Sequence, residues 1–312
     1  MRIVTFSVLG DSRLGLFTDE GVVDLARACS KYSSDGLSVL FSDARRFLDA
    51  GELAMKLAKE VGDAAREETA SGSAKDTGTL VGSDQVRLLA PIQNPQKIYC
   101  TAVNYLSHGA ESGFAAPEVP YIFTKFVNAL VGLDAPIIHP KTVKNMDMEA
   151  ELGVVIGKRG KDIPPGRAFS HVAGYTCVND VSFRDLQYGP EGPKVMNPYG
   201  QNWTKGKGLD TACPLGPWIV TRDEMEEPYP LKIIGRQNGE VIQKGNTNEM
   251  VHNVQSLVSY VSQGTTLEPG DVISTGVPAR VEGIERKYLS VGDIVEVEIE
   301  RIGVLRNRVV AG

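Results

Sequence analysis

Two glutamates stand two positions apart where an apolar run begins. Glu149 and Glu151 lie in the segment 146–157, whose later residues are almost all apolar. Because the side chains of a strand alternate between its two faces, both carboxylates project from the same face. Two like charges on a half-buried strand repel each other and lose hydration unless a cation lies between them. The spacing alone leaves two interpretations open, metal ligands or charges on a solvent-facing strand edge.

A third carboxylate fits the metal hypothesis. Asp180 ends another apolar run, residues 174–180. Three oxygen ligands without a nearby Cys or His favour Mg²⁺ or Mn²⁺ over Zn²⁺. The metal hypothesis therefore predicts a hard divalent cation held by Glu149, Glu151 and Asp180.

His108 and Glu111 are three positions apart in the segment 104–114. On a helix they share a face, so the carboxylate can orient the imidazole and make it more basic. Such an imidazole can act as a general base toward water. The residues alone leave a catalytic pair and an ordinary surface pair both open. We interpret the remaining histidines as structural: His139, His171 and His252.

Lys205 and Lys207 alternate with glycines after Trp203. Glycine allows a ligand to approach the backbone closely, and the lysines supply positive charge for an anionic substrate or a developing enolate. The alternative for both lysines is a solvated turn. The segment is not a P-loop, because the hydroxyl residue after the lysine and the upstream glycine are missing. Nucleotide binding is therefore excluded.

The composition narrows the class of protein. The chain has 312 residues, 42% of them hydrophobic, and a net charge of −6 without a basic block, so nucleic acid is not an expected partner. No apolar run approaches the ~20 residues of a membrane span, and no signal peptide is expected in residues 1–13, which lack its apolar core. Four scattered cysteines, of which Cys100 and Cys177 are expected to be buried, indicate a reducing cytoplasm.

The elements that must position these residues change in character along the chain. The sequence pattern predicts a β-hairpin over residues 1–28, helix over residues 36–69 and an exposed loop over residues 69–78. Beyond residue 86, short β-branched runs separated by Gly and Pro dominate, with helices expected at 103–113, 181–188 and 249–263. We therefore predict an α+β, mainly β protein with a small N-terminal domain, 1–85, and a catalytic domain, 86–312.

Together these motifs, in this order, resemble the fumarylacetoacetate hydrolase (FAH) family. The resemblance covers roughly residues 90–310, and the segments that carry it are 104–113, 123–125, 147–157, 174–187, 207–218, 270–278 and 291–293. It implies a mixed β-sandwich/roll catalytic domain, often preceded by a small N-terminal α/β domain, and usually a homodimer.

The resemblance also implies roles for individual residues. The divalent cation belongs at Glu149, Glu151 and Asp180, and His108 with Glu111 forms a dyad that activates water. Lys207 is the expected catalytic lysine. The expected substrate contacts are Lys125, Gln187, Gly208 and Thr275. The residues alone leave the pocket and the scaffold both open for Arg184, and the scaffold is favoured because a short helix places it near Asp180 and Asp185.

The activity implied is metal-dependent hydrolysis of a C–C bond in a small anionic β-diketo (acylpyruvate-type) 2-oxo acid. Oxaloacetate decarboxylation and 2-oxo-enoate isomerisation need the same enolate stabilisation and stay open. A catalytically silent binding or assembly protein is the third alternative, and the retained ionisable residues argue against it.

The chain departs from the family pattern around the expected site. Val277 stands where the family commonly has Thr, which removes a hydroxyl often used for substrate contact. Ser107 replaces the common Asp, Met148 the common Tyr, and Phe126 with Val127 a Pro-rich pair. None of these changes removes an expected metal ligand or a member of the dyad, but the wall of the pocket is expected to differ.

Overall fold

The N-terminal part of the chain forms an antiparallel meander covered by helices. The computed structural model describes residues 1–34, 36–71, 78–112, 117–189 and 201–312, without the side chains of 111 and 112. The predicted hairpin is confirmed, with Ile3 opposite Leu16 and a third strand after it. The strands of this part are β1 (Arg2–Val8), β2 (Asp11–Thr18), β3 (Gly21–Asp24), β4 (Leu80–Val81) and β5 (Arg87–Leu88).

The predicted helical span 36–69 is divided into separate helices. Asp43 is the N-cap of the second helix, where its side chain accepts a hydrogen bond from the Arg46 backbone N–H at 3.0 Å. Gly51, with φ of 59°, precedes the third, because this left-handed conformation suits glycine and interrupts the helix. With the helix after β3, the bounds are α1 (Leu25–Tyr32), η1 (Leu37–Phe41), α2 (Ala44–Asp49) and α3 (Glu52–Ala70).

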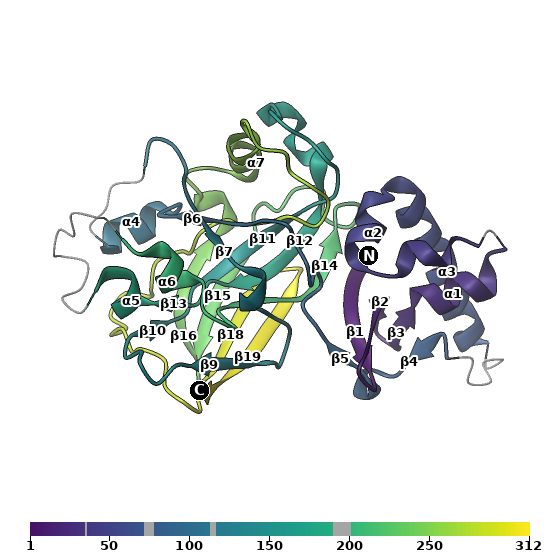
Figure 1. The fold of residues 1–312 in the computed structure, drawn as a ribbon, viewed down its shortest axis with the longest axis horizontal. Coiled ribbons are helices and arrows are strands. Elements are labelled where there is room, and N and C mark those ends of the chain that lie inside the picture. The colour runs from purple at the N-terminus through teal and green to yellow at the C-terminus, as the bar shows by residue number, and fades with distance from the viewer. Residues whose placement is uncertain (35, 72–77, 113–116, 190–200) are drawn as a thin grey trace.

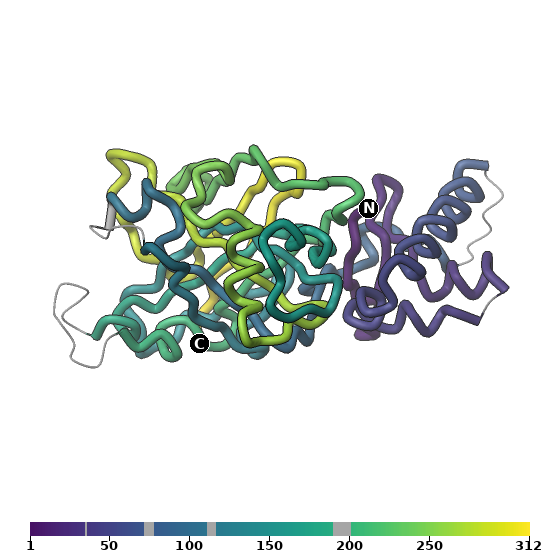
Figure 2. Tube along the Cα trace, turned by 90° about the horizontal axis from the view of Figure 1, so that it is seen from above, coloured from purple at the N-terminus to yellow at the C-terminus, as the bar shows by residue number. Residues whose placement is uncertain are grey.

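One large sheet runs through the molecule. Its main path is β4-β3-β2-β1-β14-β12-β11-β17-β6-β7, so the N-terminal strands continue into the later part through the pairing of β1 with β14. Figures 1 and 2 show the N-terminal part beside the rest of the molecule. The predicted boundary near residue 85 stays a prediction. The later strands are β6 (Ile98–Ala102), β7 (Tyr121–Lys125), β8 (Leu130–Val131), β11 (Ala150–Ile156), β12 (Val172–Asn179), β14 (Cys213–Thr221) and β17 (Val272–Ser274).

A second sheet packs against the middle of the first. Strands β15 and β18 contact β11 (Figure 1), and residues from strands of both sheets contribute to the buried hydrophobic core. Both sheets mix parallel and antiparallel pairs. The predicted α+β, mainly β fold is confirmed. The strands of this sheet, in spatial order, are β16 (Glu240–Asn246), β15 (Lys232–Gln237), β18 (Ile294–Ile299), β19 (Gly303–Ala311) and β9 (Pro136–His139).

Short elements surround the ends of the central strands. A two-stranded ladder joins β10 (Met146–Asp147) to β13 (Ser182–Phe183). The three helices expected beyond residue 86 are present with shorter bounds, and a further short helix precedes β14. They are α4 (Leu106–Ser112), α5 (Arg184–Tyr188), α7 (Val254–Ser262) and the additional α6 (Trp203–Lys207).

The cysteines behave as buried apolar residues. All four are buried, which confirms the expectation for Cys100 and Cys177. Burial raises the pKa of the Cys100 thiol well above its usual value, so it is held as a thiol rather than as a nucleophilic thiolate. Among the described residues, no helix is both long enough and apolar enough to cross a membrane.

Candidate metal centre

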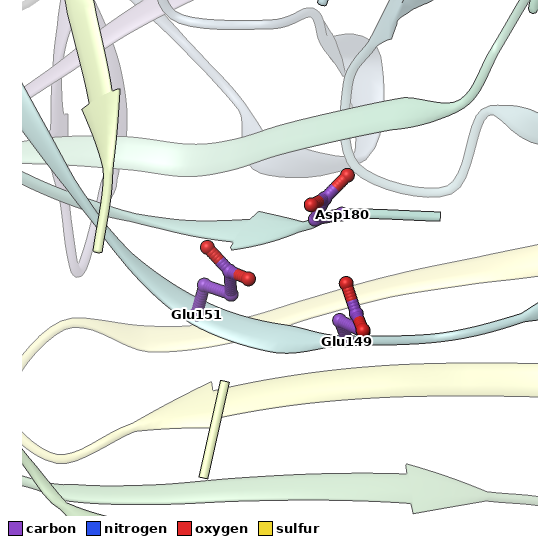
Figure 3. Close-up of side chains that lie close together, drawn as sticks. All are labelled: Glu149, Glu151 and Asp180. Carbon is purple, nitrogen blue, oxygen red and sulfur yellow. The ribbon is translucent and has the colours of Figure 1, made fainter. Parts of the chain in front are cut away.

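The pairing of β11 with β12 brings the predicted carboxylates together. Ala150 lies opposite Asn179, and the backbone N–H of Asp180 donates to the carbonyl oxygen of Glu149 at 2.9 Å. One oxygen from each of Glu149, Glu151 and Asp180 lies within 4.8 Å of the others (Figure 3). All are buried, so the two glutamates are not charges on a solvent-facing edge. We call these residues the acidic triad.

Two lysines place positive charge directly on the acidic triad. Lys207 Nζ donates to Glu149 Oε2 at 2.6 Å and to Asp180 Oδ2 at 2.7 Å. Lys125 Nζ donates to Asp180 Oδ1 at 2.5 Å, and both lysines are buried. An ammonium thus bridges two of the carboxylates. Three carboxylate oxygens of this kind are the donor set that a hard divalent cation prefers, so the residues fit such an ion.

The two glutamates differ in their electrostatics. Burial alone would raise the pKa of Glu149, but the charges of Arg184, Lys207 and His108 hold it well below its usual value. Burial, with the negative charges of Asp180 and Glu149, raises the pKa of Glu151 to about 8. A cation bound to the acidic triad would therefore act mainly on Glu151, by favouring the loss of its proton.

Glu151 is held by the end of β17 and the residues directly after it. Its Oε2 accepts hydrogen bonds from Ser274 Oγ at 2.5 Å and from the Gly276 backbone N–H at 2.9 Å. The φ of 93° at Gly276 suits glycine, and an added Cβ would lie 2.9 Å from Asn104 Cβ. The sequence Ser-Thr-Gly at the end of this strand therefore shapes the backbone around one carboxylate.

His108 lies close enough to influence the acidic triad. It is half-buried on α4, and its charge contributes to the low pKa of Glu149. Asn104 fixes the turn before this helix: its Nδ2 donates to the carbonyl oxygens of Thr275 at 2.7 Å and His252 at 2.9 Å. The side chain of Glu111 lies outside the described residues, so the dyad stays a prediction.

The expected substrate contacts lie in different surroundings. Lys125 bonds directly to the acidic triad. Gln187 is buried and accepts from Arg184 Nη1 at 3.2 Å, while Gly208 packs against the ring of Phe126. The Thr275 hydroxyl is buried beside the hydroxyl of Tyr105, so its role as a substrate contact stays a prediction.

Lys205 and Lys207 have different environments, although they lie two positions apart in the same glycine-containing segment. Lys205 is exposed, so the solvated-turn interpretation holds for it, while Lys207 is buried. Burial would lower the pKa of Lys207, but the charges of Asp180 and Glu149 raise it above its usual value. Lys207 therefore stays cationic inside the site.

The sequence left open whether Arg184 faces the pocket or the scaffold, and it indicated no role for Asp147. Arg184 was expected near Asp180 and Asp185, but its Nη2 bonds to Asp147 Oδ2 at 3.0 Å and also to Glu149. The reason is that β13 pairs with β10, which brings the start of α5 beside Asp147. The alternation of carboxylates at 147, 149 and 151 was the available signal.

Most of the chain is similar to proteins of one known family. Residues 97–310 match the family described as fumarylacetoacetate (FAA) hydrolase C-terminal. The chain belongs to the fumarylacetoacetate hydrolase family. It is 41% identical over 317 residues to a Xenopus laevis protein named oxaloacetate tautomerase fahd2, mitochondrial, which covers 99% of this chain and 90% of the relative.

Two solved structures are similar over the full length of both chains. A fumarylacetoacetate hydrolase from Exiguobacterium antarcticum is 32% identical with a TM-score of 0.77, covering 100% of each chain. A maleylpyruvate hydrolase from Sphingobium sp. SYK-6, solved with manganese(II) and pyruvate, is 25% identical with a TM-score of 0.73, again covering 100% of each. The family and the fold predicted from the sequence are thus confirmed, and the named relatives are enzymes.

Proposed function

We propose that the chain is a metal-dependent enzyme that catalyses the keto–enol tautomerisation of oxaloacetate or a closely similar 2-oxo acid. The observation that carries this proposal is the 41% identity, over 99% of the chain, with an oxaloacetate tautomerase. The acidic triad and its cationic neighbours support it, because tautomerisation passes through an enolate whose negative charge must be stabilised.

The residues of the site suit this reaction. A divalent cation held by the acidic triad, Mg²⁺ or Mn²⁺, would supply Lewis-acid stabilisation of the charge on the 2-oxo oxygen. Lys125 and Lys207 add buried positive charges that favour an anionic substrate. His108 would carry the proton to and from C3, since an imidazole exchanges protons near neutral pH.

Hydrolysis of a C–C bond is the second candidate. It is favoured by the similarity to a fumarylacetoacetate hydrolase and to a maleylpyruvate hydrolase. In that reaction His108, with Glu111, would activate water to attack the distal carbonyl carbon. Decarboxylation of oxaloacetate and 2-oxo-enoate isomerisation use the same enolate and differ in which bond breaks.

The physiological setting is proposed from the sequence. We propose a small anionic 2-oxo acid as the sole substrate class, without nucleic acid or membrane partners, in a cytoplasmic homodimer. Light scattering during size-exclusion chromatography would test the oligomer by giving twice the chain mass of 33.7 kDa.

The decisive experiment follows three products from one substrate panel. Loss of the enol absorbance reports tautomerisation, pyruvate from oxaloacetate reports decarboxylation, and carboxylic acid release from acylpyruvates reports hydrolysis. We expect metal-dependent tautomerisation of oxaloacetate to be the fastest reaction and to be abolished by a chelator. Faster acylpyruvate hydrolysis would replace the proposal with the second candidate.

A matched pair of variants tests whether the rate depends on the acidic triad or on any carboxylate of the protein. Glu151→Gln should abolish the metal-dependent rate because it removes a buried ligand. Asp134→Asn changes an exposed carboxylate that pairs with Arg306 at 3.0 Å, and it should leave the rate unchanged. An equal loss in both variants would contradict the assignment of the metal site.

A further inference from the structure

Residues 276–289 run alongside the segment that carries two of the triad carboxylates. At one end the Gly276 N–H donates to Glu151 Oε2 at 2.9 Å, and at the other the Leu289 N–H donates to the Met146 carbonyl oxygen at 2.7 Å. We call residues 276–289 the strap. Both of its ends are thus hydrogen bonded to the segment 146–151.

Two arginines of the strap meet the buried carboxylate of Asp147. Arg280 Nη2 lies 2.5 Å from Asp147 Oδ1, and Arg286 Nη1 lies 3.8 Å from Asp147 Oδ2. Arg184 reaches the same carboxylate from α5 and also bonds to Glu149 of the acidic triad. Three guanidinium groups therefore gather at the edge of the candidate metal centre, and Arg184 joins them to it.

The backbone at Arg280 is held in place by β16. Arg280 forms an isolated antiparallel bridge with Gln243. The Gln243 side chain accepts from the Ala150 N–H and donates to the Met148 carbonyl oxygen, each at 3.0 Å. The backbone on either side of Glu149 and the strap that carries Arg280 are thus fixed to the same residue, which sets the position of the arginine before any substrate arrives.

The charge around the acidic triad favours a substrate with more than one negative charge. Five cationic side chains contact three carboxylates here: Lys125, Lys207, Arg184, Arg280 and Arg286 against Asp147, Glu149 and Asp180. A divalent cation would add two further positive charges. A dianion balances these charges better than a monoanion does.

We propose that Arg280 and Arg286 bind the second carboxylate of a 2-oxo diacid and thereby make the site selective for diacids over monoacids. A guanidinium has five N–H donors in a planar fork, so one group can hold Asp147 and a substrate carboxylate together. Their side-chain exposures of 6% and 36% place Arg280 inside and Arg286 at the surface. The inference rests on the proposed function and deepens it.

The test compares oxaloacetate with its C4 monomethyl ester, which keeps the carbon framework but lacks the second charge. In Arg280→Gln and Arg286→Gln we expect kcat/KM for oxaloacetate to fall about 10- to 100-fold, the effect of a lost charge-assisted hydrogen bond. The value for the ester should stay within about threefold, because its neutral C4 group makes no such bond. Arg280→Lys should retain part of the selectivity.

A matched control and a binding measurement distinguish failure of the inference from failure of the proposed function. Arg306→Gln alters an arginine that is 55% exposed and pairs with Asp134, and it should change neither substrate. Calorimetry should show that Arg286→Gln weakens the binding of malate but not of lactate to the metal-loaded protein. An equal loss for diacid and monoacid would overturn the inference. Absence of metal-dependent turnover in the wild type would overturn the proposed function. The inference would then be decided by binding alone, through the effect of Arg286→Gln on malate affinity relative to lactate affinity.

Discussion

Glu149 and Glu151 have the same side chain and lie two positions apart, yet their surroundings move their pKa values in opposite directions. Arg184, Lys207 and His108 outweigh the effect of burial on Glu149 and keep it ionised. Glu151 is buried beside Asp180 and Glu149 and accepts its hydrogen bonds from Ser274 and Gly276. The acidic triad therefore needs a further cation chiefly at Glu151.

Metal affinity should depend on pH through Glu151. Its raised pKa of about 8 means that below pH 8 a bound ion must displace a proton, so the affinity should increase as the pH rises from 6 to 8 and then level off. The slope should approach ~10-fold per pH unit, the limit for release of one proton. Calorimetry in buffers of different ionisation enthalpy measures both the affinity and the proton release. A flat profile between pH 6 and 8 would contradict this account.

His108 is expected to act on the substrate rather than on the metal. In His108→Ala the tautomerisation rate should fall by the ~10²–10⁴ typical of a lost general base, while metal affinity stays nearly unchanged. Glu111→Gln should act in the same direction. Decarboxylation of oxaloacetate should tolerate the change better, because it depends mainly on the metal.

The control for this variant is another histidine. His171→Ala removes a ring whose Nδ1 lies 3.0 Å from the Lys158 carbonyl oxygen, outside the candidate site, and it should preserve the rate. If His108→Ala retained full activity, the proton transfer would belong to another residue.

At the scale of elements, close approach of strands determines where Asp180 lies. Gly174 on β12 faces β14 so closely that an added Cβ would be 2.2 Å from the Val220 carbonyl oxygen. Because this contact involves backbone, the strands must separate to admit any side chain. We therefore expect the placement of β12 against β11, which aligns Asp180 with Glu149, to depend on this residue far from the chemistry.

Gly174→Ala should therefore destabilise the protein and weaken metal binding together. Overpacking of this kind costs about 1–3 kcal/mol in the free energy of unfolding, which urea denaturation measures. Gly166→Ala is the matched control, because its Cβ would meet nothing within 4 Å. It should change the free energy of unfolding by less than ~0.5 kcal/mol. Equal stabilities of the two variants would show that β12 and β14 can adjust freely.

At the scale of the whole molecule, the large sheet connects the N-terminal part to the strands around the acidic triad. Trp218 on β14 stacks on Phe17 of β2 with ring centroids 4.6 Å apart, and its Nε1 donates to the Ile302 carbonyl oxygen at 2.7 Å. This one side chain contacts the N-terminal meander and the second sheet. Stability of the metal site and of the whole fold should therefore be coupled.

Metal binding should raise the stability of the entire chain in one transition. At an ion concentration 100 times the dissociation constant, the gain is about 2.7 kcal/mol, because the ion binds the native state only. Calorimetric scans with and without Mg²⁺ or Mn²⁺ measure the increase in Tm. Glu151→Gln should lose this increase and Asp134→Asn should keep it. Separate transitions, only one of them metal-dependent, would show that the two parts unfold independently.

The sequence by itself determined the types of residue available and the face of each element on which they lie. Alternation along 146–157 predicted that Glu149 and Glu151 share a face, and the order of the motifs predicted the family and the mainly β fold. These features are local or are set by the order of residues, so they can be inferred from the sequence alone.

The tertiary structure decided which of these residues meet. The pairing of β11 with β12 placed Asp180 beside Glu149, and burial separated Lys207 from Lys205. The strap brought Arg280 to Asp147, residues 133 positions apart, which no local pattern indicates. Contacts across such separations depend on strand register and on packing between sheets, and the periodicity of a single element does not specify either.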